Sequence, residues 1–309
     1  MTNLLFILLG FAALFISGKY LVVGGVQIAR FFKIPTLIIG LTIVALGTSA
    51  PELLVSLKAV LKGHPDIAIG NIIGSNISNI ALVLGMAVVI YPISVSKHMM
   101  YIDWVIMFLI SILFMVFGYF GVITRIEGII FLLIIIIYNY FSIKQGRKNK
   151  DKQEFLPPDM KWYYALLLIV ASSIGLMFGA EWLIKGASNF ARTLGVSERI
   201  ISVSMIAIGT SVPEMTTSII AAVKKESDIS IGNIVGSNIF NIAAILGITA
   251  TVHPIDVNKN FIYVDSLWMI GVSLLLFLFF VILGKREIKR VEGAFLLIAY
   301  CMYIYFLLN

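Results

Sequence analysis

The sequence predicts an all-α integral membrane protein in which ten transmembrane helices form two inverted five-helix repeats. Of its 309 residues, 60% are hydrophobic and 13% are charged, whereas soluble domains carry about 25% charged residues. Apolar runs of roughly 20 residues, the length of a helix that spans a bilayer, recur along the whole chain. The same pair of motifs occurs twice, so that Gly47 of the first copy corresponds to Gly209 of the second. We therefore expect a multi-pass protein of a cell membrane, without a separate soluble domain.

The expected spans divide the chain into two halves of five. They cover residues 3–30, 36–61, 66–91, 101–121, 125–144, 162–190, 198–222, 228–251, 261–283 and 291–308. The first half takes residues 1–144, a polar cytoplasmic linker takes 145–160, and the second half takes 161–309. We interpret the first span as a retained helix, because no basic residue precedes it as in a signal peptide.

Five spans per half is an odd number, so the second half enters the membrane from the opposite side. Equivalent residues are then related by a pseudo-two-fold axis in the membrane plane, as in many secondary transporters. With the N-terminus outside, the inner loops hold 15 basic residues and the outer loops hold 6, which favours both termini extracellular. This distribution also explains the net charge of +7 without a nucleic-acid partner.

The repeated motifs are long enough to establish an internal duplication. Residues 47–52 read GTSAPE and residues 209–214 read GTSVPE, while GNIIGSNISN at 70–79 returns as GNIVGSNIFN at 232–241. Across 47–79 and 209–241, 19 of 33 aligned positions are identical, which indicates duplication. Each copy places a glutamate in an apolar span, and a carboxylate at that depth predicts a functional site.

The spacing of the motifs predicts one cluster at the membrane midplane. Glu52 and Asn79 lie at similar distances on either side of a turn at 63–65, and inversion brings them together with Glu214 and Asn241. Proline after the glycine of each GTS motif removes a backbone donor and frees a carbonyl. Irregular backbone at membrane depth is tolerated where it lines a cavity or packs in protein.

The ligand types in this cluster favour a hard cation. Carboxylates, amides, hydroxyls and free carbonyls are all oxygen donors, as Ca²⁺ and, by extension, Na⁺ prefer. Two carboxylates balance one divalent ion. Protons compete for clustered carboxylates in a low dielectric, so we expect acid to inhibit transport. Close helix packing through glycine, serine and asparagine is the alternative reading, but it does not account for the glutamates.

Charged residues on the first and sixth spans receive a structural interpretation. Glu181 and Lys185 are spaced i,i+4 on the sixth span, and we expect them to neutralise each other. Lys19 on the first span aligns with Glu181 at the same offset that relates the motifs.

The paired GTS-x-PE and GN-x-x-GSN-x-x-N motifs resemble the alpha-repeats of the sodium/calcium exchanger family, prokaryotic type, within the cation/calcium antiporter superfamily. The resemblance implies a ten-helix fold with four ion sites in a diamond at the midplane, and no cofactor. It implies Na⁺/Ca²⁺ antiport by alternating access, in which the two ions compete for shared ligands and spans one and six slide as a gating pair.

By motif position, the resemblance also implies a ligand for each site. The expected set is Glu52 and Glu214 shared by both ions, Thr48 and Thr210 at the calcium site, Ala45, Ser49 and Ser75 at one sodium site, Ala207, Ser211 and Ser237 at the other, and Asn79 and Asn241 at the central site. Besides these ions, the expected partner is the lipid bilayer, and no obligatory protein partner is evident.

Several alternatives remain open at this point. A Ca²⁺/H⁺ or other cation/Ca²⁺ exchanger could use the same fold, and potassium-dependent members carry Asp where this chain has Asn241. A channel would conduct without a counter-ion. An intramembrane hydrolase would need a base beside Ser49 or Ser211, and the three histidines lie near loops, so we expect no enzyme.

Overall fold

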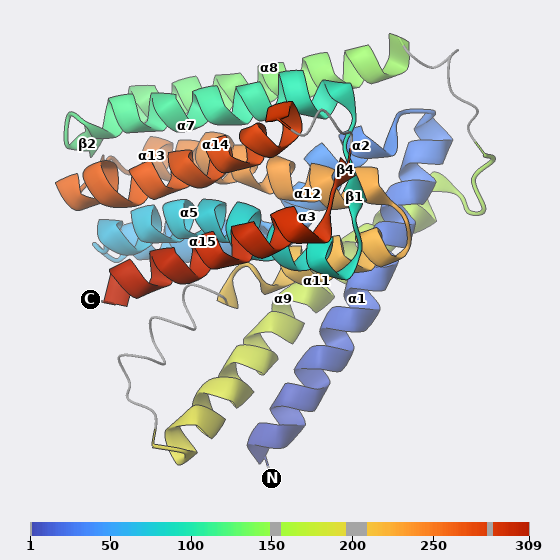
Figure 1. Cartoon of the computed structure of the whole chain (residues 1–309), viewed down its shortest axis with the longest axis horizontal. Helices are drawn as coiled ribbons and strands as arrows, with labels where there is room; N and C mark the ends of the chain where they lie inside the picture. The colour runs from blue at the N-terminus through green and yellow to red at the C-terminus, as the bar shows by residue number, and fades with distance from the viewer. Residues whose placement is uncertain (1, 149–155, 196–208, 283–286, 309) are drawn as a thin grey trace.

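A computed structural model describes residues 2–148, 156–195, 209–282 and 287–308, and this part of the chain is almost entirely helical (Figure 1). The first half comprises α1 (Thr2–Phe32), α2 (Thr36–Ile39), η1 (Gly40–Val44), α3 (Ala45–Thr48), α4 (Ala50–Leu61), α5 (Pro65–Ser78), η2 (Asn79–Leu84), α6 (Gly85–Ile90), β1 (Ile93–Ser94), η3 (Met99–Asp103), α7 (Trp104–Gly118), β2 (Val122–Ile123) and α8 (Arg125–Lys148). The segments marked η are π-helical turns.

The second half repeats this order in its described residues, and the positions equivalent to α2, η1 and part of α3 lie outside them. It comprises α9 (Trp162–Thr193), α11 (Val212–Val223), α12 (Ser227–Ile239), η5 (Phe240–Leu246), α13 (Gly247–Val252), β3 (Ile255–Asp256), η6 (Phe261–Asp265), α14 (Ser266–Ile282), β4 (Glu287–Ile288) and α15 (Arg290–Leu308). Helix α9 begins at Trp162, the expected first residue of the sixth span, whereas α8 continues to Lys148, beyond the expected end of the fifth span at residue 144.

The helix lengths agree with a multi-pass membrane protein. Eight helices in the described residues are long and apolar enough to cross a bilayer, and the pair Thr36–Thr48 and Ala50–Leu61, bent by 47°, would make a ninth. Val212–Val223 is a shorter apolar helix, and the first part of the expected span 198–222 lies outside the described residues. The count of ten spans therefore stays a prediction.

Helices α1 and α9 pack side by side in opposite directions, at an angle to the rest of the bundle (Figure 1). A Cβ atom on Gly10 would lie 2.6 Å from the backbone nitrogen of Leu183, and one on Gly24 would lie 3.1 Å from the carbonyl of Ala165. Residues early in α1 thus meet residues late in α9. Such close approach requires small side chains, and the antiparallel direction is the one that inversion predicts.

Two short antiparallel ladders connect the halves at their loops. Strand β1 of the first half pairs with β4 of the second, and β2 of the first half pairs with β3 of the second. In each ladder, the strand after the third span of one half meets the strand before the last span of the other. The two ladders are therefore equivalent, as a two-fold relation between the halves requires.

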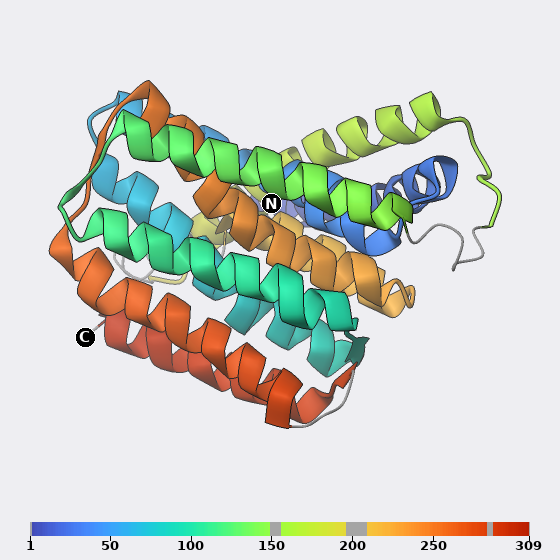
Figure 2. The same ribbon diagram turned by 90° about the horizontal axis from the view of Figure 1, so that it is seen from above.

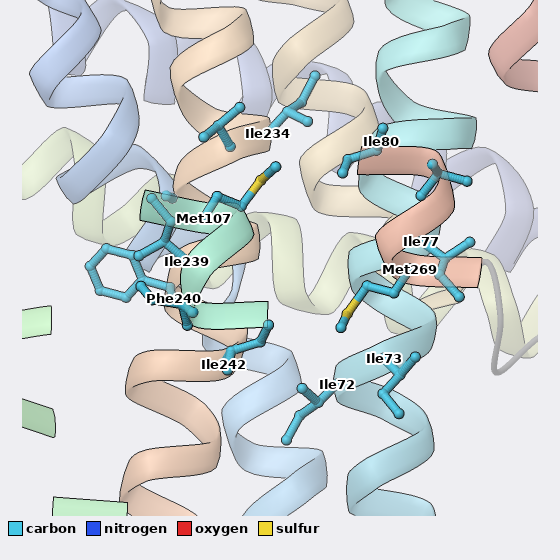
Figure 3. Close-up of a cluster of buried hydrophobic side chains, with 14 of the residues drawn as sticks. Ile72, Ile73, Ile77, Ile80, Met107, Ile234, Ile239, Phe240, Ile242 and Met269 are labelled. Atoms are coloured by element: carbon cyan, nitrogen blue, oxygen red, sulfur yellow. The ribbon is translucent and has the colours of Figure 1, made fainter. Parts of the chain in front are cut away.

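The core lies around the second and third spans of each half. Helices α5 and α12 are mostly buried, whereas α1, α8, α9 and α15 expose most of their apolar side chains. Figure 3 shows isoleucines of α5 and α12 interdigitating with Met107 and Met269. Figure 2 shows α7, α8 and α14 as a layer over this centre, and Trp104 of α7 stacks on Phe277 of α14 at 4.2 Å between ring centroids.

Candidate cation site

Both GTS-x-PE motifs interrupt their helices at the serine. Ser49 (φ −87°, ψ 8°) and Ser211 (φ −85°, ψ 1°) leave the helical conformation, and α4 and α11 begin at the next residue. Pro51 has no N–H group, so the carbonyl of Gly47 lacks its usual helical donor. The break that the sequence predicts is present, and it places each glutamate in the first turn of a new helix.

The two glutamates are buried and interact with each other electrostatically. Glu52 is 1% exposed and Glu214 is 0% exposed. The Ser49 hydroxyl donates to Oε1 of Glu214 at 2.9 Å. Oε2 of each glutamate has no hydrogen-bond partner within the described residues. A buried carboxylate oxygen without a donor is costly, and a bound cation would relieve that cost in both repeats at once.

Hydroxyl groups from opposite halves meet beside the carboxylates. Oγ1 of Thr48 lies 3.4 Å from Oγ of Ser237, and Oγ1 of Thr210 lies 3.2 Å from Oγ of Ser75. Each of these two hydroxyl pairs therefore joins one half of the chain to the other. The reason is inversion, which packs α12 of the second half against α3 of the first.

The two asparagines of the expected central site lie on π-helical segments. Asn79 begins η2 and Asn241 lies in η5, and single π-helical turns occur frequently at functional sites. Asn79 donates to Oδ1 of Asn238 at 3.1 Å. Both polar atoms of Asn241 are buried without a partner in the described part of the chain. These amides can therefore face a ligand.

One side-chain hydrogen bond within each hairpin, here called a brace, was not predicted from the sequence. Asn71 donates from Nδ2 to Ser56 at 2.9 Å, and Asn233 donates to Ser218 at 3.0 Å. Each brace ties a glutamate-bearing helix to its hairpin partner. The signal was available, since each serine lies one helical turn after its glutamate and both pairs repeat at the offset of the motifs.

The remaining expected residues have separate outcomes. Ala45 is fully buried in α3 and lies 2.9 Å from the position of a Cβ on Gly236. The Ser211 hydroxyl is buried without a partner among the described residues. Ala207 lies outside the described residues.

A cavity of about 440 Å³ leads to one end of this cluster. It touches Asn71 and Thr210, and its wall includes Pro51, Val55, Ile67, Met177, Ala180, Glu181, Ile184, Lys185 and Gly209. Thr210 is accordingly part-exposed, while its counterpart Thr48 is 0% exposed. The cluster is thus approached by open space from the Thr210 end.

Two buried carboxylates from repeated broken helices, with hydroxyls and amides around them, are the arrangement expected of a membrane transport protein, and they form a candidate cation site. The family model described as sodium/calcium exchanger protein matches residues 2–144 and 164–309. The chain belongs to this family, as its motifs predict, and its family and structural neighbours are secondary transporters rather than enzymes.

Similarity to individual relatives covers nearly the whole chain. A putative antiporter, CaxA of Alkalimonas amylolytica, is 37% identical over 99% of this chain and 98% of its own length. The sodium/calcium exchanger MaX1 of Methanosarcina acetivorans is 30% identical over 98% of this chain and 97% of its own. The solved structure of the sodium-calcium exchanger NCX_Mj superposes with a TM-score of 0.84 at 32% identity, covering 99% of this chain and 98% of that one.

Proposed function

We propose that this chain exchanges Na⁺ for Ca²⁺ across a cell membrane by alternating access, with Glu52 and Glu214 as the ligands that both ions need. One observation carries the proposal: a buried carboxylate from each repeat keeps an oxygen without a donor within the described residues. Two such charges balance one Ca²⁺ or bind several Na⁺ ions, but not both at once. Competition for the same oxygens would couple the two fluxes.

The neighbouring oxygens supply the rest of the proposed ligand set. Hydroxyls of Thr48, Ser49 and Ser237 lie near Glu214, and Ser75 lies with Thr210. The full proposed set is Glu52, Glu214, Thr48, Thr210, Asn79, Asn241, Ser49, Ser211, Ser75, Ser237, Ala45 and Ala207. Mixed carboxylate, carbonyl and hydroxyl oxygens on broken helices suit Ca²⁺ better than the rigid octahedron of Mg²⁺.

An opening on one side supports alternating access. The cavity that reaches Thr210 lies between α9 and α4. At the equivalent place in the other half, α1 packs directly on α11, where a Cβ on Gly18 would lie 2.9 Å from Ile220 and 3.1 Å from Thr216. A channel would need both passages open together, so this arrangement favours an exchanger.

The topology follows from the same proposal. Both termini lie outside the cell, the cavity beside Glu181 faces outward, and residues 145–160 link halves 1–144 and 161–309 on the cytoplasmic side. The basic residues of the loops support this orientation. The ions and the bilayer are the proposed partners.

The test is ⁴⁵Ca²⁺ uptake into proteoliposomes loaded with Na⁺, compared with liposomes loaded with K⁺ or choline. We expect uptake only with internal Na⁺, and a loss of at least about 100-fold in Glu52→Gln and in Glu214→Gln, since each removes half of the charge that balances Ca²⁺. Glu287→Gln, an exposed carboxylate in β4, is the matched control and should transport normally.

A pH gradient imposed in place of the Na⁺ gradient separates the main alternative. Uptake driven by protons alone would contradict sodium coupling and support a Ca²⁺/H⁺ exchanger on the same fold. Stimulation by K⁺ on the Na⁺ side would instead indicate potassium-dependent exchange, which the amide of Asn241 disfavours.

A further inference from the structure

The wall of the cavity carries two charges that the proposed ion site does not use. Glu181 and Lys185 of α9 both line it, with Thr210 at its inner end. They do not form the expected ion pair within the described residues; instead, the Lys185 ammonium lies 4.9 Å from the ring centroid of Phe6. The Glu181 carboxylate is exposed and has no basic partner there, so its charge acts on the cavity.

The residue equivalent to Glu181 in the first half is Lys19, of opposite charge. The antiparallel register of α1 and α9, in which Gly10 meets Leu183 and Gly24 meets Ala165, places the two residues about nine positions, or roughly 14 Å, apart along the pair. Glu181 therefore lies toward the open side of the cluster and Lys19 toward the closed side.

The closed side brings Lys19 to a second ammonium group. Helix α1 packs there on α11, and burial followed by the nearby charge of Lys19 lowers the pKa of Lys224, just beyond the end of α11. Glu226 partly offsets these charges. An opening between α1 and α11 would therefore have Lys19 in its wall, where the present cavity has Glu181.

We propose that Glu181 offsets the charge of Lys185 at one alternating entrance, whereas Lys19 leaves the other entrance positive, so that cations are captured more readily from the Glu181 side than from the Lys19 side. This inference rests on the proposed alternating access. It adds a difference between the two sides of the membrane in how readily cations are captured. A charge in a cleft with low-dielectric walls raises or lowers the local cation concentration. Neither residue needs to contact the bound ion, so both are positioning residues for capture.

The test measures the KM for Ca²⁺ separately from each side. Initial ⁴⁵Ca²⁺ uptake is measured in right-side-out and in everted membrane vesicles loaded with Na⁺. We expect Glu181→Gln to raise the KM about threefold or more on one side only, with kcat unchanged, and Lys19→Gln to lower the KM by a similar factor on the other side. Added choline chloride should reduce both effects, because it screens charge.

Matched variants distinguish capture from a general effect on the protein. Lys185→Gln, in the same wall, should lower the KM on the side where Glu181→Gln raises it. Lys58→Gln, which lies outside the cavity wall, should change neither. Equal changes on both sides, a change in kcat alone, or no change at all would overturn the inference. Wild-type exchange with Na⁺, and its loss in Glu52→Gln, would still stand in those cases, so failure of the inference is separate from failure of the proposed function.

Discussion

The hairpins α4–α5 and α11–α12 have nearly the same polar residues but different surroundings. In the second hairpin, a Cβ on Gly236 would lie 2.7 Å from both the Cα and the carbonyl oxygen of Leu41. In the first, no described atom lies within 4 Å of a Cβ on Gly74, and this glycine lines a separate cavity of about 280 Å³ beside Ser75 and Asp265. Among the described residues, one of these equivalent glycines therefore meets backbone and the other borders a cavity; Val203, the residue equivalent to Leu41, lies outside them.

The threonines show the same difference. Oγ1 of Thr48 donates to Oδ1 of Asn233 at 3.1 Å. The equivalent pair is Thr210 and Asn71, and there Oδ1 of Asn71 is buried without a partner among the described residues. Since the sequences of the two hairpins are so similar, the difference lies in how each packs on its neighbours and not in its own residues. An inverted repeat that alternates would exchange these environments between its two states.

Adding one methyl group to each of these glycines gives the largest expected contrast. Gly236→Ala should destabilise the protein by about 1–3 kcal/mol, because its new Cβ would meet backbone, and should reduce exchange about tenfold or more. Gly74→Ala should leave the melting temperature unchanged. Gly74→Ala should still slow exchange, because in the opposite state of the transporter a close backbone contact like that of Gly236 would have to form at Gly74.

Thermal unfolding and ⁴⁵Ca²⁺ uptake on the same preparations measure both effects. Full transport activity in Gly74→Ala would contradict the exchange of environments between the hairpins, whatever the result for Gly236→Ala.

The two central asparagines give a second, smaller contrast. Asn241 makes no hydrogen bond among the described residues, so Asn241→Ala should reduce exchange about tenfold with little loss of stability. Asn79→Ala removes the donor to Asn238, leaves a buried oxygen unpartnered and should cost about 1–3 kcal/mol as well as activity. Uptake and thermal unfolding again separate the two effects. A stable Asn241→Ala protein with normal KM and kcat would remove this residue from the ligand set.

Much of the fold and site followed from sequence, because duplication and depth are visible in residue spacing. The constant offset between the repeats and the position of Glu52 relative to its turn predicted the cluster, and proline after each GTS motif predicted the helix breaks. The π-helical segments at Asn79 and Asn241 could not be predicted from the sequence, since no residue type specifies where a helical turn takes up an extra residue. The contacts of Ser75 with Thr210 and of Ser237 with Thr48 depend on packing between halves, which repeat alignment alone does not give.

Acid should inhibit exchange by half or more between pH 7.5 and about pH 5, because a proton on Glu52 or Glu214 removes charge that Ca²⁺ requires. Each hairpin contributes one carboxylate, so protonation of either one is sufficient to inhibit exchange. The measurement is Na⁺-driven uptake at fixed Na⁺ and Ca²⁺ concentrations across this range, with equal pH on both sides. Activity that stays flat down to about pH 5 would contradict the shared-carboxylate mechanism.

The smallest expected effect concerns the carboxylates that begin the fourth and ninth spans. Asp103 accepts hydrogen bonds from the side chains of Tyr138 at 3.0 Å and His98 at 2.9 Å, whereas the one side chain that donates to Asp265 among the described residues is Tyr303, at 3.2 Å. The position of His98 in the first half is occupied by Asn260 in the second. The hydrogen bond to Asp103 raises the pKa of His98, and partial burial opposes it.

Because folding favours protonated His98, its stabilisation is complete below the ordinary pKa of about 6.5 and is lost as pH rises through the raised pKa. His98→Asn should therefore lower the melting temperature by about 2 °C at pH 6 and leave it unchanged at about pH 9. His64→Asn, in the exposed α4–α5 turn, is the matched control. An equal loss at both pH values would mean that His98 stabilises the loop by packing alone, and the two halves would then differ here in shape rather than in charge.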